Sequence, residues 1–330
     1  MRDAAILKVR DIRVHFKVKS KGQLPWAPPQ QLKAVDGVSF DLYAGETLCV
    51  VGESGCGKST LARAILNLVP RTAGSVAWLG QPLDAGATKE WHAARSAMQI
   101  IFQDPLASLD PRMTIGQIIA EPLQVHRPSM SKAERSTAVR AMMAKVGLRD
   151  DMLNRYAHEF SGGQCQRIGI ARALIIEPRM VVCDEPVSAL DVSIQAQIVN
   201  LLKTLQKEMG LALIFISHDL AVVKHIADRI VVMYLGQVME MADKEALFQA
   251  PKHPYTQALI SAIPIPDPRA ARSRVVNILS DDIPSPINPP SGCVFHTRCP
   301  KREARCAVET PLLLDKVSEK TACQVACLLV

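Results

Sequence analysis

Residues Gly52 to Ser59 carry the clearest chemical signal in the chain. They fit G-x-x-x-x-G-K-[ST], between an apolar run typical of a buried strand (Thr47–Val51) and a helical pattern beginning at Leu61. Backbone N–H groups of such a loop wrap phosphates, and the helix N-terminus adds positive potential. We expect Lys58 to reach the β- and γ-phosphates and the Ser59 hydroxyl to bind Mg²⁺. The other positions expected to contact a nucleotide are Ser54, Gly55, Cys56, Gly57 and Thr60.

Two carboxylates follow another strand-like run, Met180–Cys183. Asp184, at the end of that strand, can hold Mg²⁺ through water. Glu185 can then accept a proton from an attacking water as a general base. Such an acidic pair is a weak signal by itself, because acids often cap strands, but beside a phosphate loop it becomes strong.

Polar side chains follow two further strand candidates. Gln103 comes after Met98–Phe102, and His218 follows Ala212–Ile216 closely. Ligands of open α/β sheets bind at the carboxyl ends of the strands. We therefore expect His218 to contact the γ-phosphate and Gln103 to sense Mg²⁺ or the attacking water. The alternatives are a structural histidine and a polar strand cap.

A second candidate anion site opens a helix. Its residues are Ser161, Gly162, Gly163 and Gln164. Two glycines and a serine at a helix start can bind an anion. One nucleotide does not need two such sites, so the second is expected to serve the nucleotide of a facing subunit. A simply capped helix is the alternative.

The elements around these residues predict a mostly parallel α/β sheet, because apolar strand candidates alternate with helical patterns such as Ile194–Glu208. Residues 113–160 are polar and helix-prone, which predicts a helical insertion. Ile230–Tyr234 and Gln237–Met241 predict a hairpin. Ten of the 22 prolines lie between 251 and 300, which indicates a turn-rich appendage. We predict one domain over 1–250 and a second over 251–330.

Composition excludes some classes of protein. The 330 residues are 48% hydrophobic, with no apolar run of 18, so no membrane span is predicted. The start lacks the apolar region of a signal peptide, which predicts a cytosolic chain. Residues 1–33 hold eight Lys/Arg and two acids, most of the formal charge of +7. This is a solvated stretch or a contact for acidic lipid, and it is unlike the basic face of a nucleic-acid binder.

Taken together, these motifs resemble the ATP-binding cassette (ABC) family. The phosphate loop, Gln103, Ser161–Gln164, Asp184-Glu185, Ser188–Asp191 and His218 stand in the family's order, over residues 1 to about 250. The resemblance implies a RecA-like parallel sheet core, a β subdomain and the helical insertion. It also implies head-to-tail pairs of ATPases with ATP held between them, and adds Asp191 to the nucleotide-binding residues. Phe16 resembles the aromatic residue that stacks on adenine, although the insert Lys17–Gln31 follows it.

Several segments narrow the resemblance to the oligopeptide/dipeptide importer ATPases, over essentially the whole chain. They are Phe102–Pro111, Phe160–Arg167, His253–Leu259 and the cysteine-rich tail. The chain is most similar to the second of the two ATP-binding subunits of such importers. This implies ATP hydrolysis that powers peptide import from the cytoplasmic face of the bacterial inner membrane. It implies a second, non-identical ATPase, two membrane-spanning permease subunits and an external peptide-binding protein as partners, with coupling helices received near Gln103 and the helical insertion.

Two alternatives remain at this point. One is an importer ATPase of the same group for nickel, opines or peptide antibiotics. The other is a soluble ABC ATPase acting on nucleic acid or ribosomes. The single cassette, the lack of a coiled coil and the near-neutral charge beyond residue 33 disfavour the latter.

Five of the nine cysteines fall in the last 38 residues: Cys293, Cys299, Cys306, Cys323 and Cys327. In a cytosolic chain this predicts a metal site better than disulfides. The spacing lacks the CxxC pairs of structural zinc sites, and four thiolates suit zinc or an iron–sulfur cluster, with free thiols as a third possibility. The resemblance implies a [4Fe–4S] cluster and favours Cys323 over Cys327 as its fourth ligand.

The remaining cysteines receive simpler interpretations. Cys49 and Cys183 fit buried strand positions. Cys56 lies in the phosphate loop, where the helix N-terminus is expected to lower its pKa and make it prone to alkylation.

Overall fold

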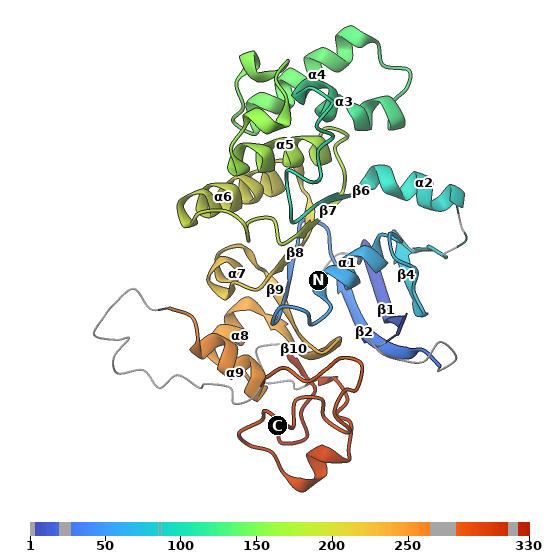
Figure 1. Ribbon diagram of the computed structural model, residues 1–330, viewed down its shortest axis with the longest axis vertical. Helices are drawn as coiled ribbons and strands as arrows, with labels where there is room; N and C mark the ends of the chain where they lie inside the picture. Colours follow the sequence, from blue (N-terminus) through green and yellow to red (C-terminus); the bar gives the residue numbers. More distant parts are fainter. Residues whose placement is uncertain (1–3, 20–27, 85, 87, 265–281, 316–322) are drawn as a thin grey trace. The chain divides into compact units, whose positions relative to one another are not determined.

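The computed structural model describes all residues except 1–3, 20–27, 85, 87, 265–281 and 316–322 (Figure 1). Parts of the insert Lys17–Gln31 and of the proline-rich run lie outside the described residues. The chain forms two compact units. The first comprises Met1–Ile6, Leu42–Thr47 and Gly86–Ser217, and the second comprises Leu7–Asp41, Leu48–Ala85 and His218–Val330.

The first unit contains three parallel strands in the order β8-β7-β6. They are β8 (Ala212–Ser217), β7 (Met180–Asp184) and β6 (Met98–Ile101). Every residue of β7 and β8 is buried, as the continuous apolar runs of parallel strands require. Helices α2 (Thr88–Ala97) and α6 (Val192–Met209) precede β6 and β8. The strands predicted from these runs are confirmed.

The predicted helical insertion is also confirmed, in the same unit (Figure 1, green). It contains α3 (Ile115–His126), α4 (Lys132–Lys145), the 3₁₀ turns η1 (Asp150–Met152) and η2 (Ala157–Glu159), and leads into α5 (Gly162–Leu174). Capping boxes start α3 at Thr114 and α4 at Ser131. These caps satisfy backbone N–H groups that have no partner inside the helix.

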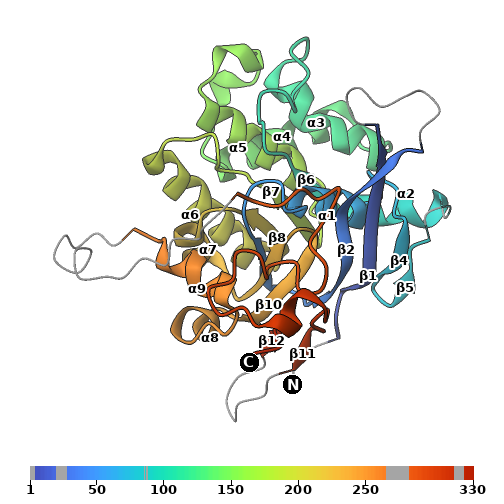
Figure 2. The same cartoon turned by 60° about the horizontal axis from the view of Figure 1, so that its bottom comes forward.

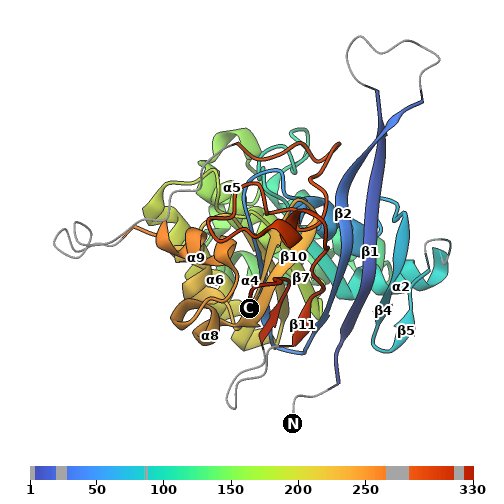
Figure 3. The ribbon, with the colours of Figure 1, turned by 90° about the horizontal axis from the view of Figure 1, so that it is seen from below.

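The second unit contains an antiparallel sheet in the order β2-β1-β4-β5 (Figure 3). Its strands are β2 (Gln30–Leu42), β1 (Leu7–Val18), β4 (Ala73–Trp78) and β5 (Gln81–Pro82). Leu7, Val9, Ile12 and Val14 of β1 are buried and polar residues lie between them, as expected for a strand with one face in the core. The extra residue between Val9 and Ile12 belongs to an irregularity in the β1–β4 register.

A second group of strands in this unit has the order β11-β12-β10-β9-β3. They are β11 (Leu314–Asp315), β12 (Cys323–Val325), β10 (Gln237–Asp243), β9 (Arg229–Tyr234) and β3 (Thr47–Val51). β3 pairs parallel with β9, and β9 and β10 form the predicted hairpin. Near the C-terminus, β12 adds an antiparallel strand to β10 (Figure 2).

Short helices complete the second unit. They are α1 (Lys58–Ile65), α7 (Leu220–Ile226), α8 (Lys244–Gln249), α9 (Pro254–Ser261) and the 3₁₀ helix η3 (Ala304–Ala307). No helix among the described residues is long and apolar enough to cross a membrane.

Candidate functional site

The phosphate loop lies in the second unit, between β3 and α1. The Lys58 side chain is buried, and its Nζ donates to the carbonyl oxygens of Gly52 at 2.9 Å and Glu53 at 3.1 Å. Gly57 has φ 103°, and a Cβ there would lie 2.0 Å from the Ala34 carbonyl oxygen. A Cβ at Gly52 would lie 2.2 Å from the Met233 carbonyl oxygen. These contacts require glycine at both positions.

The expectation for Cys56 is wrong. Its side chain is only 4% exposed, with its sulfur 4.0 Å from Lys58 Nζ. Burial raises the pKa of the Cys56 thiol, and the Lys58 ammonium offsets only part of that rise. Cys49 and Cys183 are fully buried in their strands, as expected. Burial, together with the Asp184 charge, raises the pKa of Cys183 to about 12.

Glu53, inside the phosphate loop, has a partner from the far end of the sequence. Arg298 donates from Nη1 to Glu53 Oε2 at 2.7 Å and from Nη2 to Oε1 at 3.1 Å. The Glu53 N–H donates to Tyr255 Oη at 3.0 Å. The sequence alone does not predict these contacts, because 245 residues separate the ion pair and no local pattern connects them.

The predicted catalytic carboxylate lies in the first unit. Glu185 directly follows β7, and its Oε2 accepts a hydrogen bond from Gln103 Nε2 at 3.1 Å, just beyond the end of β6. The Glu185 N–H donates to the Ile216 carbonyl at 3.2 Å. Glu185 has φ 45°, a conformation that costs a non-glycine residue energy and that recurs at functional sites. Asp184, immediately before it, is fully buried.

The second candidate anion site forms the N-terminus of α5. Gln164 Oε1 accepts hydrogen bonds from the Ser161 N–H at 3.0 Å and from Ser161 Oγ at 3.2 Å. A Cβ at Gly163 would lie 2.6 Å from Ile194 Cγ2, and one at Gly162 would lie 3.3 Å from Leu190 Cδ2. The two glycines therefore allow the start of α5 to pack against the segment that begins α6.

The remaining predicted residues lie on several elements. Asp191 is the N-cap of α6, and His218 directly follows β8 with its side chain exposed. Phe16 lies on β1 and is 37% exposed, so its ring has an accessible face. Gln103, Asp184, Glu185 and the α5 terminus belong to the first unit, whereas Phe16, the phosphate loop and His218 belong to the second.

The cysteines of residues 251–330, the C-terminal segment, fall into two environments. The thiols of Cys299, Cys306 and Cys327 all act electrostatically on Cys293, whose pKa rises to about 11, chiefly because of burial. Cys323 instead lies with its sulfur 3.7 Å from Glu240 Oε1, and burial and that carboxylate raise its pKa to about 11. Among the described residues, no three Cys, His, Asp or Glu side chains are placed to hold a metal ion.

Comparison with known proteins agrees with the fold and the motifs. Residues 35–188 match the model described as "ABC transporter", and residues 239–306 match "Oligopeptide/dipeptide transporter, C-terminal region". The oligopeptide transport ATP-binding protein OppF of Escherichia coli is 60% identical, with 96% of this chain and 95% of that protein covered. OppF of Haemophilus influenzae is 61% identical, with 98% and 96% covered.

Two solved structures are similar as well. The cbiO1 protein of Clostridium perfringens, part of an ABC transporter complex, has a TM-score of 0.64 and 26% identity, covering 75% of this chain and 92% of its own. The ADP- and phosphate-bound dimer of the ATP-binding cassette MJ0796 has a TM-score of 0.63 and 28% identity, covering 72% and 98%. The fold and the motifs together thus identify the chain as an ATPase of the ATP-binding cassette class. The chain belongs to the ABC transporter family, within its group of oligopeptide transport ATP-binding proteins.

Proposed function

We propose that this chain is the ATP-hydrolysing subunit of a bacterial oligopeptide importer. The observation that carries the proposal is the Glu185 carboxylate at the end of β7, hydrogen-bonded by Gln103 at the end of the neighbouring parallel strand. A carboxylate held there can accept a proton from a water. The transported substrate class is proposed from the curated relatives named above.

In the proposed mechanism Lys58, held by loop carbonyls, stabilises the charge on the β- and γ-phosphates of ATP. Glu185 takes the proton of the water that attacks the γ-phosphate in line. Gln103, which already contacts Glu185, orients that carboxylate and the water. His218 contacts the γ-phosphate, and Phe16 stacks on adenine. Ser59, Gln103 and Asp184 would hold Mg²⁺, which would supply positive charge opposite the phosphate oxygens.

The test of this role is Glu185→Gln. We expect ATP affinity within about threefold of wild type and turnover lower by ~10²–10⁴, the usual contribution of a general base. Glu208→Gln, on the exposed side of α6, is the matched control and should hydrolyse ATP normally. Wild-type hydrolysis by Glu185→Gln, measured in the assembled complex, would contradict the assignment.

We also propose that the α5 terminus (Ser161–Gln164), with Asp191, completes the ATP site of a facing, non-identical ATPase subunit. A phosphate would complement the backbone N–H groups at this helix start. The known dimeric structure of a similar cassette supports pairing of this kind. Pull-down of the full-length chain from solubilised membranes should recover that second ATPase. Recovery of ribosomes or nucleic acid instead would overturn the transport proposal.

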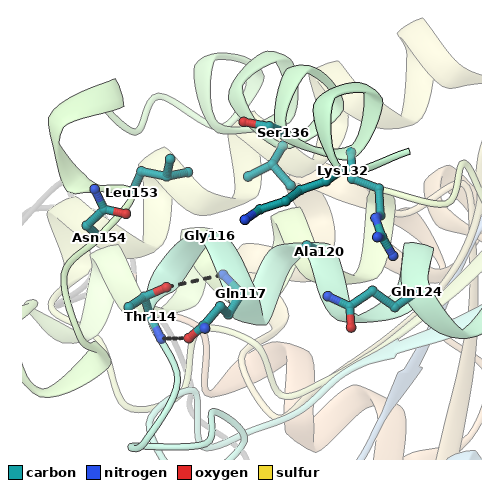
Figure 4. A pocket seen from close by; sticks show the side chains of 11 residues that line it. Thr114, Gly116, Gln117, Ala120, Gln124, Lys132, Ser136, Leu153 and Asn154 are labelled. Carbon is teal, nitrogen blue, oxygen red and sulfur yellow. Dashed lines mark hydrogen bonds between the residues drawn. The ribbon is translucent and has the colours of Figure 1, made fainter. Parts of the chain in front are cut away.

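The same pull-down tests the membrane partners. We propose that these are two permease subunits that hold this chain at the cytoplasmic face of the inner membrane. An external peptide-binding protein is an indirect partner. A groove of about 480 Å³ between α3 and α4 supports docking on the helical insertion (Figure 4). Gln117 and Gln124 from α3 and Lys132 and Ser136 from α4 line it. No acidic or aromatic side chain lines the groove, and the apolar Ala120, Val139 and Leu153 lie among its polar and basic residues. A loop or helix end that carries both polar and apolar side chains suits such a surface.

For the cysteines we propose a structural [4Fe–4S] cluster in a C-terminal domain beginning near residue 251. Thiolates are its usual ligands. Cys299, Cys306 and Cys327 act electrostatically on Cys293, whereas the Cys323 sulfur lies 3.7 Å from Glu240 Oε1, so we propose Cys327, the alternative to Cys323, as the fourth ligand. Iron and acid-labile sulfide in anaerobically purified protein would test this. We expect Cys327→Ser to lose both and Cys323→Ser to keep them. Zinc instead of iron would contradict the proposal.

A further inference from the structure

The contact between Arg298 and Glu53 differs from the other ion pairs of the C-terminal segment. The Arg298 side chain is 6% exposed and that of Glu53 24%, whereas the Arg305–Glu303 pair nearby is 47% and 56% exposed. Both guanidinium nitrogens bind, one to each carboxylate oxygen. Such bidentate pairs fix geometry as well as supplying energy.

Glu53 is also held through its backbone, so the residue is fixed at three points. Arg298 binds the carboxylate, Tyr255 Oη accepts from the N–H, and the carbonyl accepts from Lys58 Nζ at 3.1 Å. Glu53 therefore connects Arg298, in the C-terminal segment, to the Lys58 ammonium, which is expected to bind the phosphates of ATP. A shift of the Glu53 backbone would therefore move an acceptor of Lys58.

An aromatic cluster fixes Arg298 in turn. Its guanidinium lies 5.8 Å from the centre of the Tyr234 ring. Tyr234, Tyr255 and Phe295 pack against one another with ring centres 4.9 to 5.3 Å apart, and all three are fully or almost fully buried. Because all three rings are buried and in contact with one another, they support the ion pair from one side.

We propose that Arg298 is a positioning residue for the phosphate loop. Through Glu53 it holds the carbonyl that orients Lys58, and the C-terminal segment thereby sets the affinity of the site for ATP. This inference rests on the proposed ATP-binding function of the loop. If Arg298 is neutralised, the half-buried Glu53 carboxylate loses its counter-charge, and because a partly desolvated charge without its partner is costly the loop relaxes toward water.

The experiment measures the Kd of Mg²⁺-ATP for the full-length chain and, in parallel, its thermal midpoint. We expect Arg298→Gln and Glu53→Gln each to raise Kd about tenfold. The double variant should be no weaker than either single variant, because both remove the same contact. Arg298→Lys keeps the positive charge but loses the bidentate contact, so its Kd should lie between those of wild type and Arg298→Gln. Arg305→Gln, which removes the exposed pair, should bind as wild type.

The outcomes separate this inference from the proposed function. Lys58→Ala must abolish ATP binding, and if it does not, the loop is not the ATP site. If Lys58→Ala fails to bind while Arg298→Gln and Glu53→Gln bind normally at a lower thermal midpoint, the pair is only structural and the inference is wrong. Additive losses in the double variant would also overturn it. Should Arg298→Gln not fold, Glu53→Gln and Arg298→Lys decide the question alone.

Discussion

At the residue scale, burial determines the chemistry of several groups more than sequence neighbours do. Cys56 was expected to be reactive because it precedes a helix, yet its side chain is buried. The Cys56 sulfur and the Met233 carbonyl both pack closely against Gly52 of the same loop. Motif and spacing identified the phosphate loop, Gln103 and Glu185 correctly as neighbours of strand ends. The exposure of each side chain depends on which distant segments of the chain pack against it, and a single sequence does not reveal that packing.

The Cys56 thiol should therefore react slowly with N-ethylmaleimide. Its pKa is raised by burial, and the thiolate is the reactive form. We expect its labelling at pH 7.5 to be at least ~10-fold slower in the native chain than in urea. Mass spectrometry of the peptide that contains Cys56 gives both rates. Equal rates in the two conditions would contradict the burial described above.

His253 should make stability depend on pH. Burial lowers its pKa to about 4, while its Nδ1 accepts from the Tyr255 N–H at 3.1 Å, so the folded state keeps it neutral. Because this pKa lies below the unfolded value near 6.5, the stability is fully present above pH 6.5. It is lost as pH falls toward 4, by up to about 3 kcal/mol.

Urea unfolding at pH 7.0 and 4.5 measures this loss. His253→Asn keeps an acceptor for the start of α9 and removes the titration, so its free energy of unfolding should fall less between these two pH values. An equal fall in wild type and variant would show that His253 is not the group responsible.

At the element scale, strands and helices with strong apolar patterns were predictable from sequence. β3, β6, β7 and β8 are mostly apolar runs, and the helical insertion was recognised by its polar, helix-prone composition. The short strands β11 and β12 were not, because two or three residues carry no periodicity. They form strands only through pairing, β12 with β10 and β11 with β12. Tertiary contact created these elements.

The packing of α5 against the start of α6 gives a prediction at this scale. Gly163→Ala would place a Cβ 2.6 Å from Ile194 Cγ2, which should cost about 1–3 kcal/mol of overpacking. Gly169→Ala is the matched control in the same helix, since nothing lies within 4 Å of its added Cβ. It should stabilise the chain by about 0.5–1 kcal/mol. Urea midpoints of the two variants should therefore move in opposite directions.

At the scale of the whole molecule, the C-terminal segment is part of the second compact unit. That unit contains residues on both sides of position 250, so the domain boundary proposed there needs a direct test. Truncation after Ala250 would remove Tyr255, Phe295 and β12. Each buried aromatic side chain contributes about 1.5–3 kcal/mol, a large part of a total stability of about 5–15 kcal/mol.

We therefore expect the truncated chain to accumulate mainly as insoluble material, with a clearly lower thermal midpoint in any soluble fraction. A chain ending at Pro311 is the control, because it retains Tyr255, Phe295 and Arg298 while it loses β11 and β12. It should be intermediate. A wild-type midpoint for the shorter chain would show that residues 251–330 fold and act independently.

The distance along the chain between Glu53 and Arg298 also has a consequence for synthesis. A ribosome that adds about 5–20 residues per second makes the loop roughly 12–50 s before its partner 245 residues later. During that interval the nascent chain contains every residue of the phosphate loop but not the arginine that secures it. If Arg298 positions the loop as proposed, a product that terminates before this residue competes poorly for cellular ATP.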